Sequence, residues 1–225
     1  MKKIFVITLF CLFIFNLTFC QNNEKKEANL DNELVAILDT IHTEDQKYRM
    51  QSNEIEKKYG WNSDEMKALW IIINKMDSIN LFKVEKILDN KGWLSVNIIG
   101  EQGNTTLFLV IQHSDIETQL KYLPMMRDAV NKGNAKPGQL AFLEDRVALE
   151  QGKRQIYGSQ LRSDPTSGEY FVSPLIDPEN VNKRRAEVGL GTIEDYIKYW
   201  GLTWDVKKHK ERTAKIEFEK KKLKK

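Results

Sequence analysis

The segment that decides the fold is Pro137-Gly-Gln-Leu-Ala-Phe-Leu-Glu-Asp-Arg-Val-Ala-Leu-Glu-Gln151, which is followed by Gly152. A proline at the first position and a glycine just past the end are typical helix boundaries, so this segment predicts a helix. Its apolar residues fall on two opposite sides, with Leu140, Leu143 and Val147 on one and Phe142 and Leu149 on the other. A helix that is apolar on both sides is expected at the centre of a domain.

The sequence predicts five more helices before this segment, the first three from apolar residues at helical spacing. They cover 30–59, a stretch that opens at Asp64, a stretch capped by Ser78 or Asn80, 105–113 and 115–131. Residues 105–113 suit a buried strand as well, and we favour the helix. Ser114 and Glu117 form a capping-box pattern at the start of the last of these helices.

The C-terminal part predicts a β-hairpin and two shorter helices. Residues 155–161 and 169–175 flank a loop with turn residues, which is typical of a hairpin with a long connection. Asp177 precedes Pro178 in an N-cap pattern for a helix that ends at Gly189, and a last short helix follows Thr192. The prediction is therefore a mainly α, single-domain helical bundle with one small β-hairpin near its C-terminal helices.

The two ends of the chain differ in character from this domain, which we place at residues 30–204. Residues 21–29 are a polar tether. Residues 205–225 hold ten Lys or Arg against four acids, which predicts a solvated helix or a disordered arm. Such a tail either stays in solution or contacts anionic lipid headgroups at the membrane periphery.

Residues 1–20 have the pattern of an export signal. Lys2 and Lys3 precede the apolar run 4–15, which is too short to span a membrane. Two processing routes fit, because Thr18 and Cys20 suit ordinary cleavage before Gln21 and Cys20 alternatively ends a loose lipobox. A retained N-terminal anchor is the third alternative. We therefore expect an exported protein that is periplasmic, outer-membrane-associated or secreted. If it is lipidated, the lipid is attached to Cys20.

Composition excludes several classes of protein. The only cysteines are Cys11 and Cys20, so neither a disulfide scaffold nor a cysteine zinc site fits the folded part. The three histidines lack metal-ligand spacing, and no nucleotide-binding glycine loop, metalloprotease motif or serine-hydrolase elbow occurs. A formal net charge of only +3 argues against nucleic acid as a partner. We expect no metal or cofactor, and the partner stays unknown.

Charged and amide residues in apolar surroundings are the candidate site. Asp45 lies on the apolar stripe of the first helix with Arg49 one turn on, and Asp145 and Arg146 lie on the central helix. His113 ends the most apolar segment of the chain outside residues 1–20. The remaining candidates for ligand binding are Asp115, Gln155, Tyr157, Gln160 and Arg185. So many polar groups in one helical core favour a shared use.

These residues also mark a resemblance. Gln112-His113-Ser114-Asp115, Asp145-Arg146, Tyr157-Gly158-Ser159-Gln160, Asp177-Pro178 and Arg184-Arg185-Ala186-Glu187-Val188-Gly189-Leu190 occur in this order, with Asp45-Gln46, Arg49 and Gly92-Trp93 before them. The chain resembles, over roughly residues 40–200, a bacterial family catalogued as a domain of unknown function. It departs from that pattern at Leu94, where proline is more common, and at Ser159, where threonine is usual. The resemblance implies no activity or catalytic residue.

Three hypotheses for the function follow. In the first, an exported envelope protein binds a small ligand or a partner in a polar pocket rimmed by Tyr157 and Arg185. In the second, a hydrolase-like enzyme uses His113 as acid or base, with Asp145 to orient it and Arg146 or Arg185 to hold an anionic group. In the third, the polar groups only fix the packing: Asp145 pairs with Arg146, Asp115 caps a helix, and Gln155 and Gln160 complete backbone hydrogen bonds.

Overall fold

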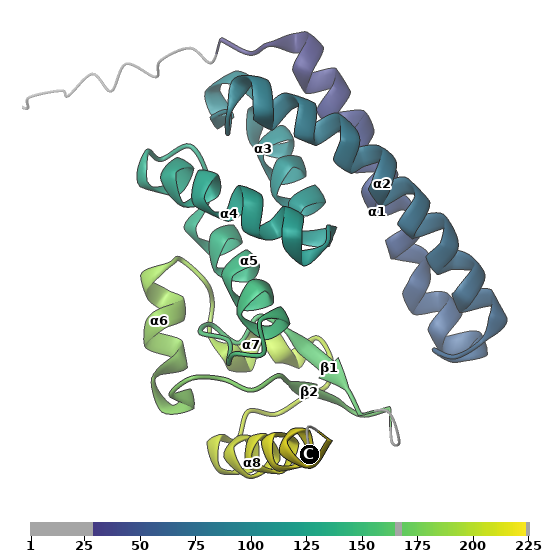
Figure 1. Cartoon of the computed structure of the whole chain (residues 1–225), viewed down its shortest axis with the longest axis vertical. Helices are drawn as coiled ribbons and strands as arrows, with labels where there is room; N and C mark the ends of the chain where they lie inside the picture. The colour runs from purple at the N-terminus through teal and green to yellow at the C-terminus, as the bar shows by residue number, and fades with distance from the viewer. Residues whose placement is uncertain (1–28, 165–167, 224–225) are drawn as a thin grey trace, which may run out of the picture.

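The computed structural model describes residues 29–164 and 168–223. Over these residues it is mainly helical with one small antiparallel sheet, as the sequence predicts (Figure 1). The helices are α1 (Asn32–Tyr59), α2 (Asp64–Lys91), α3 (Val96–His113), α4 (Ile116–Asn131), α5 (Pro137–Glu150), the 3-10 helix η1 (Pro178–Asn180), α6 (Val181–Glu187), α7 (Ile193–Lys198) and α8 (Val206–Leu223). The strands are β1 (Leu161–Ser163) and β2 (Tyr170–Val172). The predicted export signal lies outside the described residues.

Helix α2 is one long helix where the sequence predicted two. Ser78 does not cap a new helix, because its hydroxyl donates to the Asn74 carbonyl one turn back at 2.9 Å. Asn80, the other predicted cap, is fully buried inside α2. The helix begins instead at the N-cap Ser63, whose side chain accepts from the Met66 N–H at 3.2 Å. Tertiary packing therefore keeps two polar residues inside a helix where local preference alone favoured a break.

The main hydrophobic core lies where α3, α4 and α5 meet the N-terminal half of α1 and the C-terminal half of α2. Its fully buried members include Leu38 and Ile41 from α1, Leu107 and Ile111 from α3, and Leu143 from α5. Helix α5 contacts both α3 and α4, as its two apolar sides predict. The segment 105–113 is helical, as favoured, and the described part of the chain confirms the mainly α fold.

A second, smaller core holds the far end of the α1–α2 hairpin together. Met66, Leu69 and Ile73 of α2 are buried there against Tyr48 and Ile55 of α1. Figure 1 shows this end of the hairpin extending away from α4 and α5. Between the two apolar clusters, α1 and α2 carry polar side chains that face the inside of the hairpin, and the candidate site is built on this polar layer.

The C-terminal part forms its own small core of Val172, Leu175, Val181, Ile193 and Ile197. The β-hairpin is shorter than predicted, since only β1 and β2 pair in register, with Leu161 opposite Val172. Beyond the paired strands, an isolated bridge joins Gln155 to Leu175.

Two helix starts differ from the predicted caps. Asp177 adopts a left-handed backbone conformation (φ 41°) and makes no side-chain cap, so η1 precedes α6, which ends at Glu187 before Gly189. At α4 the N-cap is Asp115, which accepts from the Thr118 N–H at 2.8 Å, in place of the predicted Ser114–Glu117 capping box.

The basic segment 205–225 is a helix that packs against the domain over its described residues. His209 and Thr213 of α8 are buried, and His209 lies against Trp204 with ring centroids 5.0 Å apart. Ion pairs join its exposed side to the domain, from Arg212 to Glu169 and from Arg154 to Glu217. Glu217, an acid within the basic segment, therefore takes part in fixing the helix. No helix among the described residues is apolar enough over sufficient length to span a bilayer.

Candidate functional site

Asp145 is a structural anchor for the turn 155–160. It is fully buried on α5, and its carboxylate accepts from the N–H groups of Ile156 at 2.6 Å, Tyr157 at 2.9 Å and Ser159 at 2.9 Å. Burial raises the pKa of Asp145, while these three donors lower it by favouring the ionised form. With both oxygens held by the backbone, Asp145 is not the partner of His113. The ion pair between Asp145 and Arg146, which the third hypothesis predicts, does not form between these two described residues.

The neighbouring predicted residues hold the same turn. The Gln155 amide donates to the carbonyls of Gln160 at 3.0 Å and Ser173 at 2.8 Å, and its oxygen accepts from the Gln160 N–H. Arg185 is 2% exposed, and its guanidinium donates to the carbonyls of Gly191 and Tyr157. These contacts match the structural alternative for Gln155. Neither Tyr157 nor Arg185 lines the hollows that lie beside α8, between α5 and the segment 188–190, or along α1 in the described part of the chain.

His113 is paired with Asp45, a carboxylate that the sequence assigned to ligand binding. The two residues come from the C-terminal end of α3 and the middle of α1, and His113 Nδ1 lies 3.0 Å from Asp45 Oδ1. The Asp45 side chain is 1% exposed to solvent, whereas the His113 side chain is 18% exposed. We call this pair the dyad.

Three further contacts hold the Asp45 carboxylate in place. Gln46 donates to Oδ2 at 2.7 Å and Arg49 donates to Oδ1 at 3.3 Å, while the other Arg49 nitrogen pairs with Asp77 on α2 at 2.7 Å. Burial by itself raises the pKa of Asp45, but the hydrogen bond and charge of His113, the charge of Arg49 and the Gln46 hydrogen bond outweigh it and lower that pKa. Asp45 is therefore ionised at neutral pH.

The state of Asp45 fixes the tautomer of the histidine. An ionised carboxylate only accepts hydrogen bonds, so the proton of a neutral His113 ring resides on Nδ1. Among the residues that the structure describes, His113 hydrogen-bonds through Nδ1 alone. Its Nε2 therefore carries a lone pair that is free to accept a proton, and the imidazolium formed then faces a negative charge.

Arg146 follows Asp145 on α5 but faces a different environment. It is half-buried, and its Nε is buried without a hydrogen-bond partner among the described residues. Burial lowers the pKa of Arg146, Glu150 opposes that effect, and the positive charge of Arg49 adds to it.

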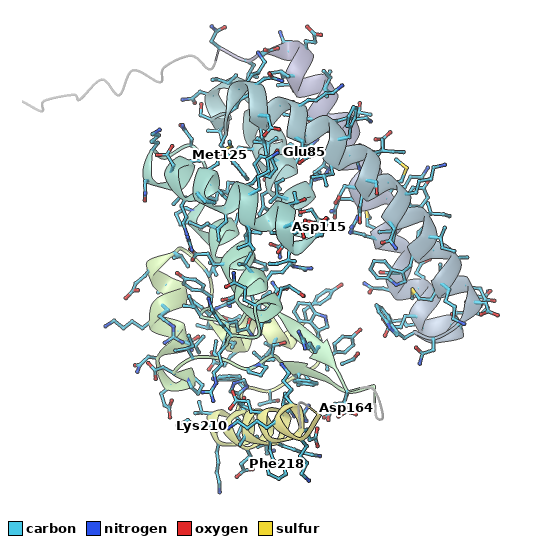
Figure 2. The ribbon with its side chains drawn as sticks, viewed as in Figure 1. Glu85, Asp115, Met125, Asp164, Lys210 and Phe218 are labelled. Atoms are coloured by element: carbon cyan, nitrogen blue, oxygen red, sulfur yellow. The ribbon has the colours of Figure 1, made fainter. Side chains whose placement is uncertain are left out.

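One stripe of α1 presents this polar side to the rest of the molecule. After Asp45 and Arg49, the next residues at helical spacing are Asn53, which donates to the Tyr199 hydroxyl at 3.5 Å, and Glu56, which accepts from the Tyr170 hydroxyl at 3.2 Å. Polar contacts therefore join the C-terminal half of α1 to β2 and to Tyr199, the residue just after α7. Figure 2 shows Asp115, close to His113 in the chain, on the side of α4 that faces the α1–α2 hairpin.

The structure thus divides the predicted set in two. Asp45, Arg49 and His113 lie together, whereas Asp145, Gln155, Tyr157, Gln160 and Arg185 surround the anchored turn. The Nε of Arg146 joins neither group among the described residues. Asp115 is exposed and acts as the N-cap of α4. Within the described residues, no group of three His, Cys, Asp or Glu side chains is placed to bind a metal ion.

Sequence reasoning missed Asp77 because it ended the second helix near Ser78. Met66, Leu69 and Ile73 are followed at the same spacing of three and four residues by Asp77, Asn80, Val84 and Ile87. A single long helix therefore places Asp77 and Asn80 on its buried stripe. That periodicity was the available signal for a polar layer between two apolar clusters.

Comparison with known proteins gives one match. No curated protein and no solved structure matches the chain significantly. The model of a family of unknown function, DUF6624, matches residues 28–209, which include every residue of the dyad, the anchored turn and the polar stripe of α1. The match covers most of the chain and confirms the resemblance to a domain of unknown function, whereas the specific order of motifs stays a prediction. The chain therefore belongs to the family of unknown function DUF6624.

Proposed function

We propose that the protein is an acid–base enzyme of the hydrolytic type and that the His113–Asp45 dyad carries its chemistry. The observation behind this proposal is the 3.0 Å contact between His113 Nδ1 and a buried, ionised Asp45, on a histidine that is still partly exposed. A positioned histidine whose other nitrogen is held by a carboxylate is the usual arrangement of a general base. Asp45 takes the orienting role that the sequence gave to Asp145.

The proposed reaction starts with proton transfer. Nε2 of His113 accepts a proton from a water molecule, and the resulting hydroxide adds to an electrophilic carbon or phosphorus of the substrate. The imidazolium then returns the proton to the leaving group, which restores the neutral ring. Asp45 stays ionised throughout and stabilises the imidazolium, while Arg49 and Gln46 keep its oxygens oriented toward His113.

The dyad also argues against a purely structural polar cluster at this position. A histidine that only fills a core has both ring nitrogens buried and hydrogen-bonded. Around the anchored turn the structural hypothesis is the better one, since its polar atoms are taken by backbone partners. If the predicted polar groups bind a ligand, we place the binding site around the dyad and not at Tyr157 and Arg185.

A hydrolysis assay tests the proposal. Purified protein is incubated with p-nitrophenyl esters of acetic, butyric and phosphoric acid over a range of pH, next to the His113→Gln and Asp45→Asn variants. We expect turnover of at least one ester to fall about a hundredfold or more in His113→Gln, because general base catalysis contributes roughly that factor. The loss in Asp45→Asn is expected to be smaller.

His42→Gln is the matched control, because His42 lies on α1 one turn before Gln46 and has no role in the dyad. Its turnover is expected to equal that of the unchanged protein. Equal rates in the unchanged protein and His113→Gln, including no rate above buffer in either, would contradict the proposal.

Export is the second part of the proposal. It is supported by the basic residues Lys2 and Lys3, the apolar run 4–15 and the polar residues after Cys20. Cell fractionation after expression of the full chain is expected to find the protein outside the cytoplasm. A Cys20→Ser variant distinguishes the two processing routes, because lipidation requires the thiol and ordinary cleavage does not. A full-length product retained in the cytoplasm would overturn this part.

A further inference from the structure

A hollow that the proposed reaction does not use lies between β2, the segment after α7 and α8 (Figure 1). Its volume is about 280 Å³, near the lower end of the roughly 300–1,000 Å³ that small-molecule sites occupy. That volume suits a single ring better than an extended chain. We call it the Trp204 hollow, and its lining includes Phe171, Val172, Ile197, Leu202, Trp204 and His209.

His209 is the buried polar residue of the Trp204 hollow. It is 8% exposed, its ring packs against Trp204 with centroids 5.0 Å apart, and its Nε2 lies 3.4 Å from the Thr213 hydroxyl. The other ring nitrogen, Nδ1, makes no hydrogen bond with any described residue. Ring nitrogens of mostly buried histidines are usually hydrogen-bonded, so Nδ1 leaves one position open for a ligand.

The chemistry of His209 favours a hydroxyl group as the partner of Nδ1. Burial, helped by the charges of Arg154 and Arg212, lowers the pKa of His209 to about 4, so the ring is uncharged at neutral pH. An uncharged imidazole has one donor and one acceptor nitrogen, and the Thr213 hydroxyl suits either role of Nε2. A ligand hydroxyl likewise donates to or accepts from Nδ1, whereas a carboxylate only accepts and an ammonium group only donates.

The charged residues around the Trp204 hollow favour an uncharged ligand. Two basic residues, Lys208 and Arg212, and two acidic residues line it, so the formal charges cancel. Arg212 pairs with Glu169 at 3.1 Å and lies over the Phe171 ring at 4.8 Å. Asp205 accepts from the Lys208 N–H at 3.0 Å. An ionic ligand therefore meets no excess of opposite charge to replace its hydration.

The remaining walls of the Trp204 hollow are apolar or aromatic. Ile197 and Val172 belong to the small C-terminal core, and Leu202 and Trp204 pack against that core. Phe171 adds a second aromatic ring. Apolar walls with one open hydrogen-bonding group match a ring that has C–H groups on its faces and hydroxyls at its edge.

From this arrangement we infer that the Trp204 hollow binds a neutral monosaccharide, whose ring packs against Trp204 and whose hydroxyl hydrogen-bonds to Nδ1 of His209. No residue of the dyad lines this hollow. The inference therefore adds a second site to the protein and does not depend on the proposed function.

The first test compares neutral and charged sugars on the unchanged protein. Isothermal titration calorimetry is carried out with D-glucose, D-galactose, D-mannose and N-acetyl-D-glucosamine, and with the charged sugars D-glucosamine and D-glucuronic acid. We expect at least one neutral sugar to bind, and both charged sugars to bind about tenfold more weakly than it does, because a charge loses hydration without gaining a partner. No binding of any neutral sugar, or equal or tighter binding of a charged one, overturns the inference.

The second test places the bound sugar with a pair of tryptophan variants. Trp204→Leu removes an aromatic wall of the hollow, and we expect it to bind the sugar about tenfold more weakly. Trp61→Leu is the matched control, because it removes a half-exposed indole from the turn between α1 and α2. It is expected to bind as the unchanged protein does. Equal affinities in the two variants would place the sugar elsewhere and overturn the inference.

The third test removes the hydrogen-bonding nitrogens of His209. His209→Phe keeps a ring against Trp204, and we expect about fivefold weaker binding from the loss of one hydrogen bond. Thermal unfolding with and without the sugar gives a second readout, since a ligand raises the unfolding temperature of the protein that binds it better. Unchanged affinity in folded His209→Phe overturns the inference. If this variant does not fold, the two tests above decide.

Discussion

Asp45 and Asp145 are both buried aspartates on helices, yet they are stabilised in different ways. Asp145 accepts hydrogen bonds from backbone N–H groups of one turn. Asp45 contacts side chains, namely His113, Arg49 and Gln46. Backbone N–H donors do not change their protonation state, so the contacts of Asp145 fix the conformation of the turn. A carboxylate surrounded by ionisable side chains can support proton transfer, and burial alone therefore does not identify a functional acid.

The largest effect that sharpens this comparison is expected for Asp145→Ala. The substitution leaves the N–H groups of Ile156, Tyr157 and Ser159 without their acceptor, so we expect the free energy of unfolding to fall by about 3–5 kcal/mol. Urea denaturation measures the change. The control is Asp128→Ala, which removes an exposed pair with Lys132 and is expected to cost less than about 1 kcal/mol. Similar losses in the two variants would show that the turn does not depend on Asp145.

The second largest effect is expected for His209, a buried histidine whose contribution to stability changes with pH in a different range from that of the two aspartates. Burial, helped by the charges of Arg154 and Arg212, lowers the pKa of His209 to about 4. The unfolded chain binds a proton near pH 6.5 and the folded chain only near pH 4, so stability decreases as the pH falls between these values. The decrease is at most roughly 3 kcal/mol.

The measurement for His209 is the free energy of unfolding between pH 8 and pH 4. His209→Gln is expected to flatten the curve in this window, whereas His42→Gln is expected to leave it unchanged. An unaltered slope in His209→Gln would assign the acid sensitivity to another group.

Asp45→Asn is expected to have a smaller effect that depends on pH. The lowered pKa of Asp45 stabilises the folded state above the ordinary aspartate pKa of about 3.9, and this contribution is lost as the pH falls through the lower folded value. At pH 7 we expect a loss of about 1–3 kcal/mol, because the ionised acceptor of His113 and Arg49 is replaced by a neutral one. The difference in unfolding free energy between the two proteins is measured from pH 7 to pH 3. A difference that stays constant down to pH 3 would contradict the lowered pKa.

The smallest change in stability is expected for His113→Gln. Asp45 keeps its contacts with Arg49 and Gln46 in this variant, so we expect a loss below about 1 kcal/mol. The same variant is expected to lose ester turnover. It therefore distinguishes an effect on activity from an effect on stability more clearly than the other variants do. A loss comparable to that of Asp145→Ala would make the dyad a structural element like the anchored turn.

Helical periodicity was sufficient to predict much of the fold. The apolar stripes of 30–59 and 137–151 predicted α1 and the central α5, and both ends of α5 carry the expected Pro137 and Gly152. The predicted break near Ser78 was wrong because local cap preferences were given more weight than a stripe that continued through Asp77 and Asn80. The partner of Asp77 is Arg49 on the neighbouring helix, and the sequence of α2 does not show it.

The sequence by itself determined that α1 and α5 carry charged residues among apolar ones, since helical spacing depends only on position along the chain. Only the tertiary structure decided that His113 pairs with Asp45 and that Asp145 serves the turn 155–160. Two aspartates of equal chemistry differ only in which groups surround them after folding. His113 comes from α3 and the donors to Asp145 come from the loop after α5, so the spacing within a single helix carries no information about either. Arg49, one turn after Asp45 on the same helix, is the neighbour that spacing does indicate.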